Sequence, residues 1–217
     1  MILIEKTTVN GFEESIRGCR NPYDSWNKID SSYDENGNFI IGPNDKKLMT
    51  NLSNAGPVES KYLRMIIVYT DVTAPLYWWK EYDTYKVGTV ANSCSTMHTL
   101  LESEFTLDNF STDFIESEIS KSSFNIIIDT LNILRDKYLD IKASTSFTPE
   151  EKKIALKSVW YEIIQLLPSS FNQKRTIMLN YEVLKNIYKS RKNHKLKEWK
   201  DFISWIEKLP YSDLIIC

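Results

Sequence analysis

The segment Thr148-Pro149-Glu150-Glu151 constrains the fold more than any other part of this sequence, because it fixes the start of a helix. A threonine at the N-cap accepts a hydrogen bond from the first turn, and a proline suits the first helical position. A glutamate three residues after the cap bonds back to the N-cap, which completes a capping box. The helix that begins here is predicted to run to Leu167 and to stop before Pro168.

The rest of the chain after about Asp113 also has helical spacing. One helix is predicted because apolar residues recur every three or four positions over five turns. These residues are Phe124, Ile127, Ile128, Leu131, Leu134, Tyr138 and Ile141. Two further helices are predicted over about 170–190 and over 196–209, the second ended by Pro210.

The first half of the chain carries the predicted strands. Residues 2–9 and 62–72 are rich in β-branched and aromatic side chains, which is typical of strands. Asn36-Gly37 indicates a hairpin turn next to a short strand over 39–41. Shorter helices are predicted over 12–19 and over 46–53, the latter with Asp45 as its N-cap.

The predicted fold class is therefore α+β in a single domain of 217 residues. A short N-terminal sheet packed with helices is expected within about 1–112. A largely helical part is expected over about 113–217.

Residues 74–98 hold two adjacent tryptophans, three tyrosines and Gly88. Pro75 is placed to open an aromatic helix that ends near Tyr82. Two interpretations are open: the aromatic helix is part of the core and an ordinary turn follows, or the polar run after Gly88 builds a site. Composition favours the first, because aromatic clusters are more often core than site. The polar run comprises Asn92, Ser93, Ser95, Thr96 and His98.

Composition excludes several classes of protein. The three cysteines are scattered without a CxxC pair and only two histidines occur, which supports neither a disulfide framework nor a zinc site. The net charge of -2 argues against a surface made wholly for nucleic acid. The first residues lack the pattern of a signal peptide, and no apolar run is long enough to span a bilayer. A soluble cytoplasmic protein without a metal or membrane partner is expected.

Residues 185–200 contain seven lysines and arginines against one acid, Glu198. Arg191 presents a planar fork that suits a phosphate or the carbonyl edge of a pyrimidine. On one helix, Asn180 and Arg191 would share a face whose other members are apolar. Because such polar groups are costly to bury unpaired, this face is expected to meet either a ligand or water. The alternative is an ordinary solvated helix face.

The segment LNYEVLKNIYKSRKNHKLKEW also has the spacing of a family motif. The matching residues are Asn180, Leu184, Asn186, Arg191, His194 and Trp199. The pattern resembles that of the flavin-dependent thymidylate synthases (ThyX), which methylate deoxyuridylate with a flavin and a folate. Glu182 stands where that family has an arginine, and the histidine is displaced by one residue.

A second segment extends the resemblance. Laid on residues 85–98, the family signature Arg-His-Arg-x-x-Ser-x-Asn-Glu-x-Ser-x-Arg-Tyr matches at Asn92 and Ser95. The two leading arginines, the glutamate and the final arginine of the signature are replaced. Upstream, the family's Pro-Phe-Glu-His falls on residues 57–60, with Ser60 in place of the histidine.

The resemblance implies a ThyX-like fold, a homotetramer and a set of site residues. Arg191 would polarise the pyrimidine, and no protein side chain would act as nucleophile. Further substrate contacts would come from Ser95, Asn92 and Lys86, and flavin contacts from Asn180, Asn186, His194, Tyr85 and Ser60. The implied cofactor is FAD, with NADPH and methylenetetrahydrofolate as co-substrates.

Three functions follow as hypotheses. The first is a divergent ThyX-like protein that binds a pyrimidine nucleotide and flavin and methylates dUMP or a related pyrimidine. The second is a catalytically silent binding or assembly protein that kept the fold while its cofactor arginines were lost. The third is a nucleic-acid-binding helix over 185–200, which the overall acidity disfavours.

Overall fold

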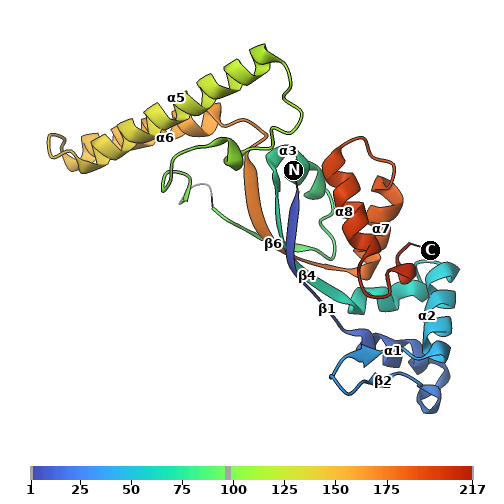
Figure 1. Ribbon diagram of the computed structural model, residues 1–217. Helices are drawn as coiled ribbons and strands as arrows, with labels where there is room; N and C mark the ends of the chain where they lie inside the picture. Colours follow the sequence, from blue (N-terminus) through green and yellow to red (C-terminus); the bar gives the residue numbers. More distant parts are fainter. Residues whose placement is uncertain (1, 96–98, 217) are drawn as a thin grey trace. The chain divides into compact units, whose positions relative to one another are not determined.

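The computed structural model describes residues 2–95 and 99–216, which divide into two compact units (Figure 1). We call Ile2–Thr73, Glu81–Asn92 and Lys174–Cys217 the sheet unit. We call Ala74–Lys80 and Ser93–Gln173 the hairpin unit. Each unit is described by itself.

The sheet unit is built on a four-stranded sheet. In spatial order its strands are β1 (Leu3–Asn10), β4 (Ile67–Pro75), β6 (Asn172–Asn180) and β5 (Val90–Ser93). β1 pairs antiparallel with β4, from Leu3 opposite Thr73 to Asn10 opposite Ile67. The opening strand is therefore confirmed, and the second strand is confirmed over its later part.

The predicted strand over 62–72 is wrong at its start. Glu59–Met65 form a 3-10 helix in which Tyr62 and Leu63 are buried, and β4 begins at Ile67. A short apolar run is compatible with either a buried helix or a strand, so its sequence could not place this boundary. The other short 3-10 segments are Asn21–Tyr23, Trp26–Lys28, Leu107–Asn109 and Ser212–Leu214.

The segment after β1 contains two helices and a two-stranded hairpin. These elements are α1 (Phe12–Arg20), β2 (Ser32–Tyr33), β3 (Phe39–Ile40) and α2 (Pro43–Ala55). The hairpin turn is confirmed, because β2 pairs with β3 and Gly37 takes a φ of 79° between them. Such a positive φ is the conformation that the Asn-Gly pair predicts.

Asp45 is not the N-cap of α2, which corrects the sequence prediction. The helix begins at Pro43, and its first N–H groups are capped from a distance by the Asp30 carboxylate, which accepts from Asn44 N (2.8 Å) and Asp45 N (3.0 Å). Asp45 itself is fully buried and accepts hydrogen bonds from Arg20 Nη2 (2.7 Å) and Nε (3.0 Å). The local pattern could not show a cap supplied by a residue outside the helix.

The predicted helix over 170–190 is wrong in its first half. Residues 172–180 form β6, in which Ile177 and Leu179 are fully buried and alternate with more exposed neighbours. The helix α7 (Tyr181–Arg191) follows, and the Asn180 side chain caps it by accepting from Val183 N at 3.0 Å. Asn180 is therefore the N-cap of α7 and is not part of the helix itself.

The last predicted helix is confirmed as α8 (Lys197–Glu207). Its apolar side packs into the sheet unit, where α7 also contacts α8 and the 3-10 helix Glu59–Met65. The fully buried side chains of this core include Met49, Leu63, Ile66, Val68, Val72, Ile177, Leu179, Leu184, Ile187, Trp199, Phe202 and Ile206.

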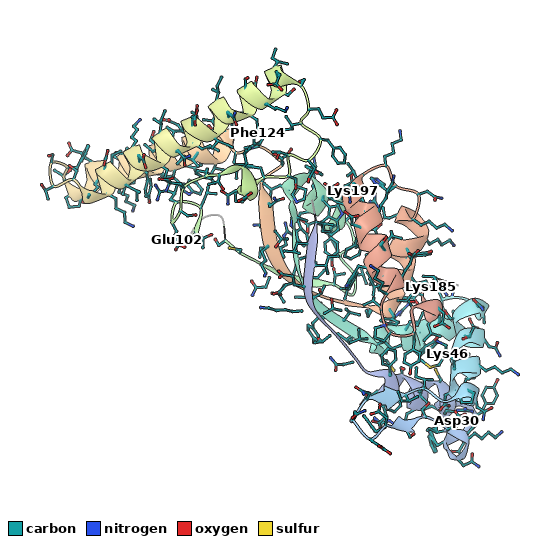
Figure 2. All side chains as sticks on the ribbon, viewed as in Figure 1. Asp30, Lys46, Glu102, Phe124, Lys185 and Lys197 are labelled. Atoms are coloured by element: carbon teal, nitrogen blue, oxygen red, sulfur yellow. The ribbon has the colours of Figure 1, made fainter. Side chains whose placement is uncertain are left out.

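The hairpin unit contains two long helices that lie side by side (Figure 1), α5 (Glu118–Ala143) and α6 (Pro149–Leu166). The capping box of α6 is confirmed: Glu151 N donates to Thr148 Oγ1 (3.3 Å), and Thr148 N donates to Glu151 Oε2 (2.9 Å). The hydrophobic core of this unit comprises Leu100, Phe105, Phe110, Phe124 (labelled in Figure 2), Ile128, Leu131, Leu134, Val159 and Ile163.

The aromatic helix is α3 (Leu76–Tyr82), which begins directly after Pro75 as predicted. Trp78 and Trp79 are buried, and the Trp79 indole N–H donates to Gln173 O at 2.9 Å. The core interpretation is therefore confirmed for both tryptophans. None of the helices formed by the described residues combines the length and apolar character that crossing a membrane requires.

The α+β fold class is confirmed, with strands and helices in the predicted halves apart from β6.

Candidate functional site

A cavity of about 790 Å³ opens in the sheet unit. Its walls come from the end of α2, the segment 56–64, the loop at Gly88, α7 and the C-terminal segment. Three residues that the sequence predicted as flavin contacts line it together: Ser60, Asn180 and Asn186. The volume falls within the range of about 300–1,000 Å³ that is usual for ligand pockets.

Hydrogen bonds within the protein fix one wall of this cavity. Ser60 is almost fully buried, and its Oγ donates to Glu182 Oε2 at 3.2 Å, across 122 positions of sequence. Gly88 has a φ of 77°, and a Cβ there would lie 2.9 Å from Asn180 Nδ2 and 3.1 Å from Val183 Cγ2. Only glycine allows the loop to approach the start of α7 this closely.

The cavity carries an excess of positive charge. Among the described residues that line it, Arg64, Lys185, Lys189 and Lys192 stand against one carboxylate, that of Glu182. Lys185 (labelled in Figure 2) already has protein partners, because its Nζ donates hydrogen bonds to Ser53 O (2.6 Å) and Ser53 Oγ (2.7 Å).

The other three cations are available to a ligand. The side chains of Arg64, Lys189 and Lys192 are exposed and make no hydrogen bond or ion pair with any residue in the described part of the chain. Such a set of donors suits a phosphorylated ligand.

Arg191 lies in a second group of the sheet unit, which we call the Glu81 cluster: Glu81, Tyr85, Arg191, His194 and Trp199. Arg191 Nη1 donates to Glu81 Oε2 at 2.9 Å, and Arg191 Nε donates to Tyr85 Oη at 2.9 Å. Trp199 Nε1 donates to the same Glu81 oxygen at 2.8 Å, and the Arg191 guanidinium lies 4.8 Å from the Trp199 ring centroid. His194 Nε2 lies 3.5 Å from Glu81 Oε2.

The Glu81 cluster leaves one edge of Arg191 available. Nη2 makes no hydrogen bond or ion pair with any residue that the structure describes, and 21% of the side chain is exposed. The guanidinium is therefore held in one orientation on two sides while its remaining nitrogen could donate to a ligand oxygen.

Two solved structures of ThyX from Helicobacter pylori, both with FAD and dUMP, are similar to this chain over nearly its whole length. One has a TM-score of 0.63 and 16% sequence identity and covers 100% of this chain and 96% of that one. The other has a TM-score of 0.58, again at 16% identity, and covers 99% and 96%. The chain has the ThyX fold. No protein-family model matches the sequence, and a search of curated proteins found no match either.

On this ThyX fold, the residues predicted for the site divide into three sets. Ser60, Asn180 and Asn186 converge on the cavity, and Tyr85, Arg191 and His194 converge on Glu81. Lys86, Asn92 and Ser95 belong to neither. Lys86 and Asn92 are exposed, and Ser95 lies in the hairpin unit, where its carbonyl accepts from Thr99 N at 3.1 Å. Thr96 and His98 lie outside the described residues.

The sequence analysis missed Glu81, although the residue organises half of the candidate site. Glu81 lies 110 positions before Arg191, inside an aromatic stretch whose rings and polar run are its evident features. One signal was present. A guanidinium on an otherwise apolar helix face requires a partner, and a carboxylate inside a buried aromatic helix requires one too.

Proposed function

We propose that this chain is a ThyX-like protein that binds FAD and a pyrimidine nucleotide through its sheet unit and methylates dUMP or a related pyrimidine. The observation that carries the proposal is the cavity of about 790 Å³, which gathers Ser60, Asn180 and Asn186 beside an excess of cations. Its fold is that of proteins solved with FAD and dUMP. The proposal includes NADPH and methylenetetrahydrofolate as co-substrates and a homotetrameric assembly.

The side chains of the cavity fit a flavin nucleotide. Lys189, Lys192 and Arg64 would neutralise the diphosphate, and each is exposed to the cavity without a protein partner among the described residues. Asn186 accepts weakly from Ser190 Oγ (3.5 Å) through its Oδ1, which leaves its amide N–H₂ to donate to a ring carbonyl. A bound flavin would supply the redox chemistry, while these residues bind and orient it.

Arg191 would act on the pyrimidine nucleotide. Its Nη1 and Nε are fixed by Glu81 and Tyr85, so Nη2 would donate to a carbonyl of the ring without a cost of reorientation. Stacking on Trp199 holds the plane of the guanidinium. In this role the other members of the Glu81 cluster would position Arg191, and within the cluster only Arg191 would contact the substrate.

The second candidate is a catalytically silent binding protein with the same fold. The ion pair between Arg191 and Glu81 favours it, because a guanidinium neutralised by a carboxylate withdraws less charge from a ligand than an unpaired one. The replacement of the family signature's two leading arginines within residues 85–87 also favours a silent protein.

Thermal unfolding with and without FAD and dUMP tests the proposal. A ligand that binds only the native state, at a hundredfold excess over its dissociation constant, adds about 2.7 kcal/mol to the free energy of unfolding. We expect the melting temperature to rise with each ligand. An unchanged melting temperature with both ligands would reject the proposed function. Formation of dTMP in the presence of NADPH and methylenetetrahydrofolate separates the enzyme from the silent protein.

A further inference from the structure

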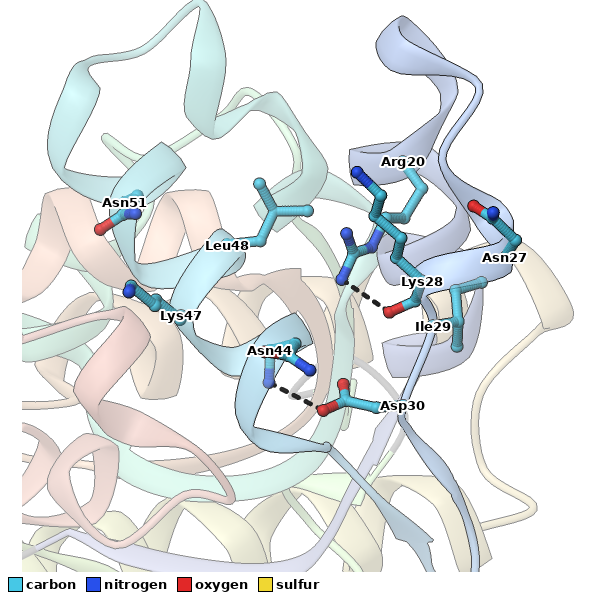
Figure 3. A pocket seen from close by; sticks show the side chains of 9 residues that line it. All are labelled: Arg20, Asn27, Lys28, Ile29, Asp30, Asn44, Lys47, Leu48 and Asn51. Atoms are coloured by element: carbon cyan, nitrogen blue, oxygen red, sulfur yellow. Dashed lines mark hydrogen bonds between the residues drawn. The ribbon is translucent and has the colours of Figure 1, made fainter.

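A second cavity of the sheet unit, of about 630 Å³, shares no lining residue with the first (Figure 3). One side is formed by Arg20, at the end of α1, and by Asn27, Lys28, Ile29 and Asp30 of the segment that follows α1 (Figure 3). The α2 residues Asn44, Lys47, Leu48 and Asn51 form the other. No part of the proposed function uses this cavity.

The acidic groups of the second cavity, Asp30 in its lining and the buried Asp45 beside it, already have hydrogen-bond partners. The Asp30 carboxylate caps the N-terminus of α2 through two backbone N–H groups. Asp45, which is fully buried beside the cavity, accepts two hydrogen bonds from Arg20 and three from Asp30 N, Ser31 N and Ser31 Oγ. Arg20, Lys28 and Lys47 outnumber these two carboxylates, so a net positive charge remains at the cavity.

Most of the basic and amide groups that line the same cavity have no hydrogen-bond partner among the described residues. The ammonium groups of Lys28 and Lys47 make no hydrogen bond or ion pair with any described residue, and neither do the side-chain amides of Asn27, Asn44 and Asn51. Arg20 is 8% exposed and is fixed through Nε and Nη2, whereas its Nη1 has no partner within the described chain.

We propose that this second cavity binds a phosphate monoester. A fixed guanidinium edge and two ammonium groups give the phosphate both an oriented donor and local positive charge. The cavity is much larger than a single phosphate, and Ile29, Leu48 and the three asparagines offer apolar and polar contacts for the organic part of the ligand.

The test is an NMR titration of the full chain labelled with ¹⁵N at asparagine, with inorganic phosphate and glycerol 3-phosphate as probes. Sodium chloride at matched ionic strength is the control for general salt effects. We expect the side-chain amide signals of Asn27, Asn44 and Asn51 to shift and to saturate. Signals of Asn180 and Asn186 report the first cavity separately, so failure of one proposal is distinguishable from failure of the other.

Matched variants complete the test. Lys28→Gln/Lys47→Gln removes two charges from the cavity without touching the buried Arg20–Asp45 pair, and is expected to weaken binding at least about fivefold. Lys208→Gln removes an exposed charge elsewhere in the sheet unit and is expected to bind as the wild type does. Shifts that do not saturate, or equal affinities in the wild type and the double variant, would overturn the proposal.

Discussion

Asp45→Ala is expected to lower the free energy of unfolding by about 3–5 kcal/mol, because it leaves the buried Arg20 guanidinium without its counter-ion. Asp45 is fully buried, and Arg20 exposes only 8% of its side chain. The substitution also removes the acceptor for Ser31 Oγ, 2.7 Å away. Urea unfolding followed by far-ultraviolet circular dichroism measures the loss.

Asp213→Ala is the matched control in the same unit. Asp213 pairs with Lys46, and both side chains are partly or largely exposed, so this pair is expected to contribute less than about 1 kcal/mol. If Asp45→Ala costs no more than Asp213→Ala, the buried ion pair does not stabilise the segment around α1 and α2 as we infer.

The Asp45 carboxylate is also expected to make the free energy of unfolding depend on pH. Burial disfavours the ionised form of Asp45, but hydrogen bonds from Ser31 and Arg20 outweigh burial, so its pKa lies below the usual value of 3.8. The unfolded chain then binds the proton more readily than the folded one. The stabilisation is present above about pH 4 and is lost as the pH falls through the folded pKa. Asp45→Asn is expected to remove this part of the acid sensitivity.

Arg191→Lys is expected to weaken the binding of dUMP by about 1–3 kcal/mol, which is roughly five- to 150-fold. A lysine keeps the charge but lacks the planar fork whose separate nitrogens contact Tyr85 and Glu81 and leave Nη2 for a ligand. Calorimetric titration with dUMP measures the change. Lys197→Ala, whose Nζ pairs with Asp201 on an exposed surface, is the control for general charge. Equal and small losses in the two variants would show that Arg191 does not contact the nucleotide.

In the same titration, Glu81→Gln shows whether Glu81 positions Arg191 for binding or only stabilises the fold. Glutamine keeps the size of the side chain and loses the charge that orients Arg191 Nη1. If the Glu81 cluster positions Arg191, the variant should bind dUMP more weakly. A variant that unfolds more easily but binds dUMP with unchanged affinity would assign the cluster to stability alone.

The sequence predicts those elements of the fold whose signals are local. The capping box at Thr148 requires only four residues, and Pro75 with the rings behind it opens α3 as expected. The boundary at Asn180 was misplaced because its cue is tertiary. The burial of Ile177 and Leu179 makes residues 172–180 a strand, and an N-cap asparagine then marks where the helix starts.

The candidate site also contains residues that the sequence predicts and residues that only the tertiary structure reveals. The resemblance named Ser60, Asn180 and Asn186, and the fold brings them to one cavity. It also named Arg191 and His194, but not the carboxylate between them, because a charge pair across 110 positions leaves no periodic pattern in one sequence. The cap that Asp30 supplies to α2 has no local pattern either, because it comes from outside the helix.

Fluorescence titration of FAD against the wild type and Lys189→Ala/Lys192→Ala tests the central claim most directly. We expect saturable quenching at one FAD per chain, and binding about tenfold weaker in the double variant, which removes two cations that line the first cavity. Lys28→Gln/Lys47→Gln, in the second cavity, should bind FAD as the wild type does. Absence of saturable binding, or equal affinity in the wild type and Lys189→Ala/Lys192→Ala, would contradict a flavin site at this cavity.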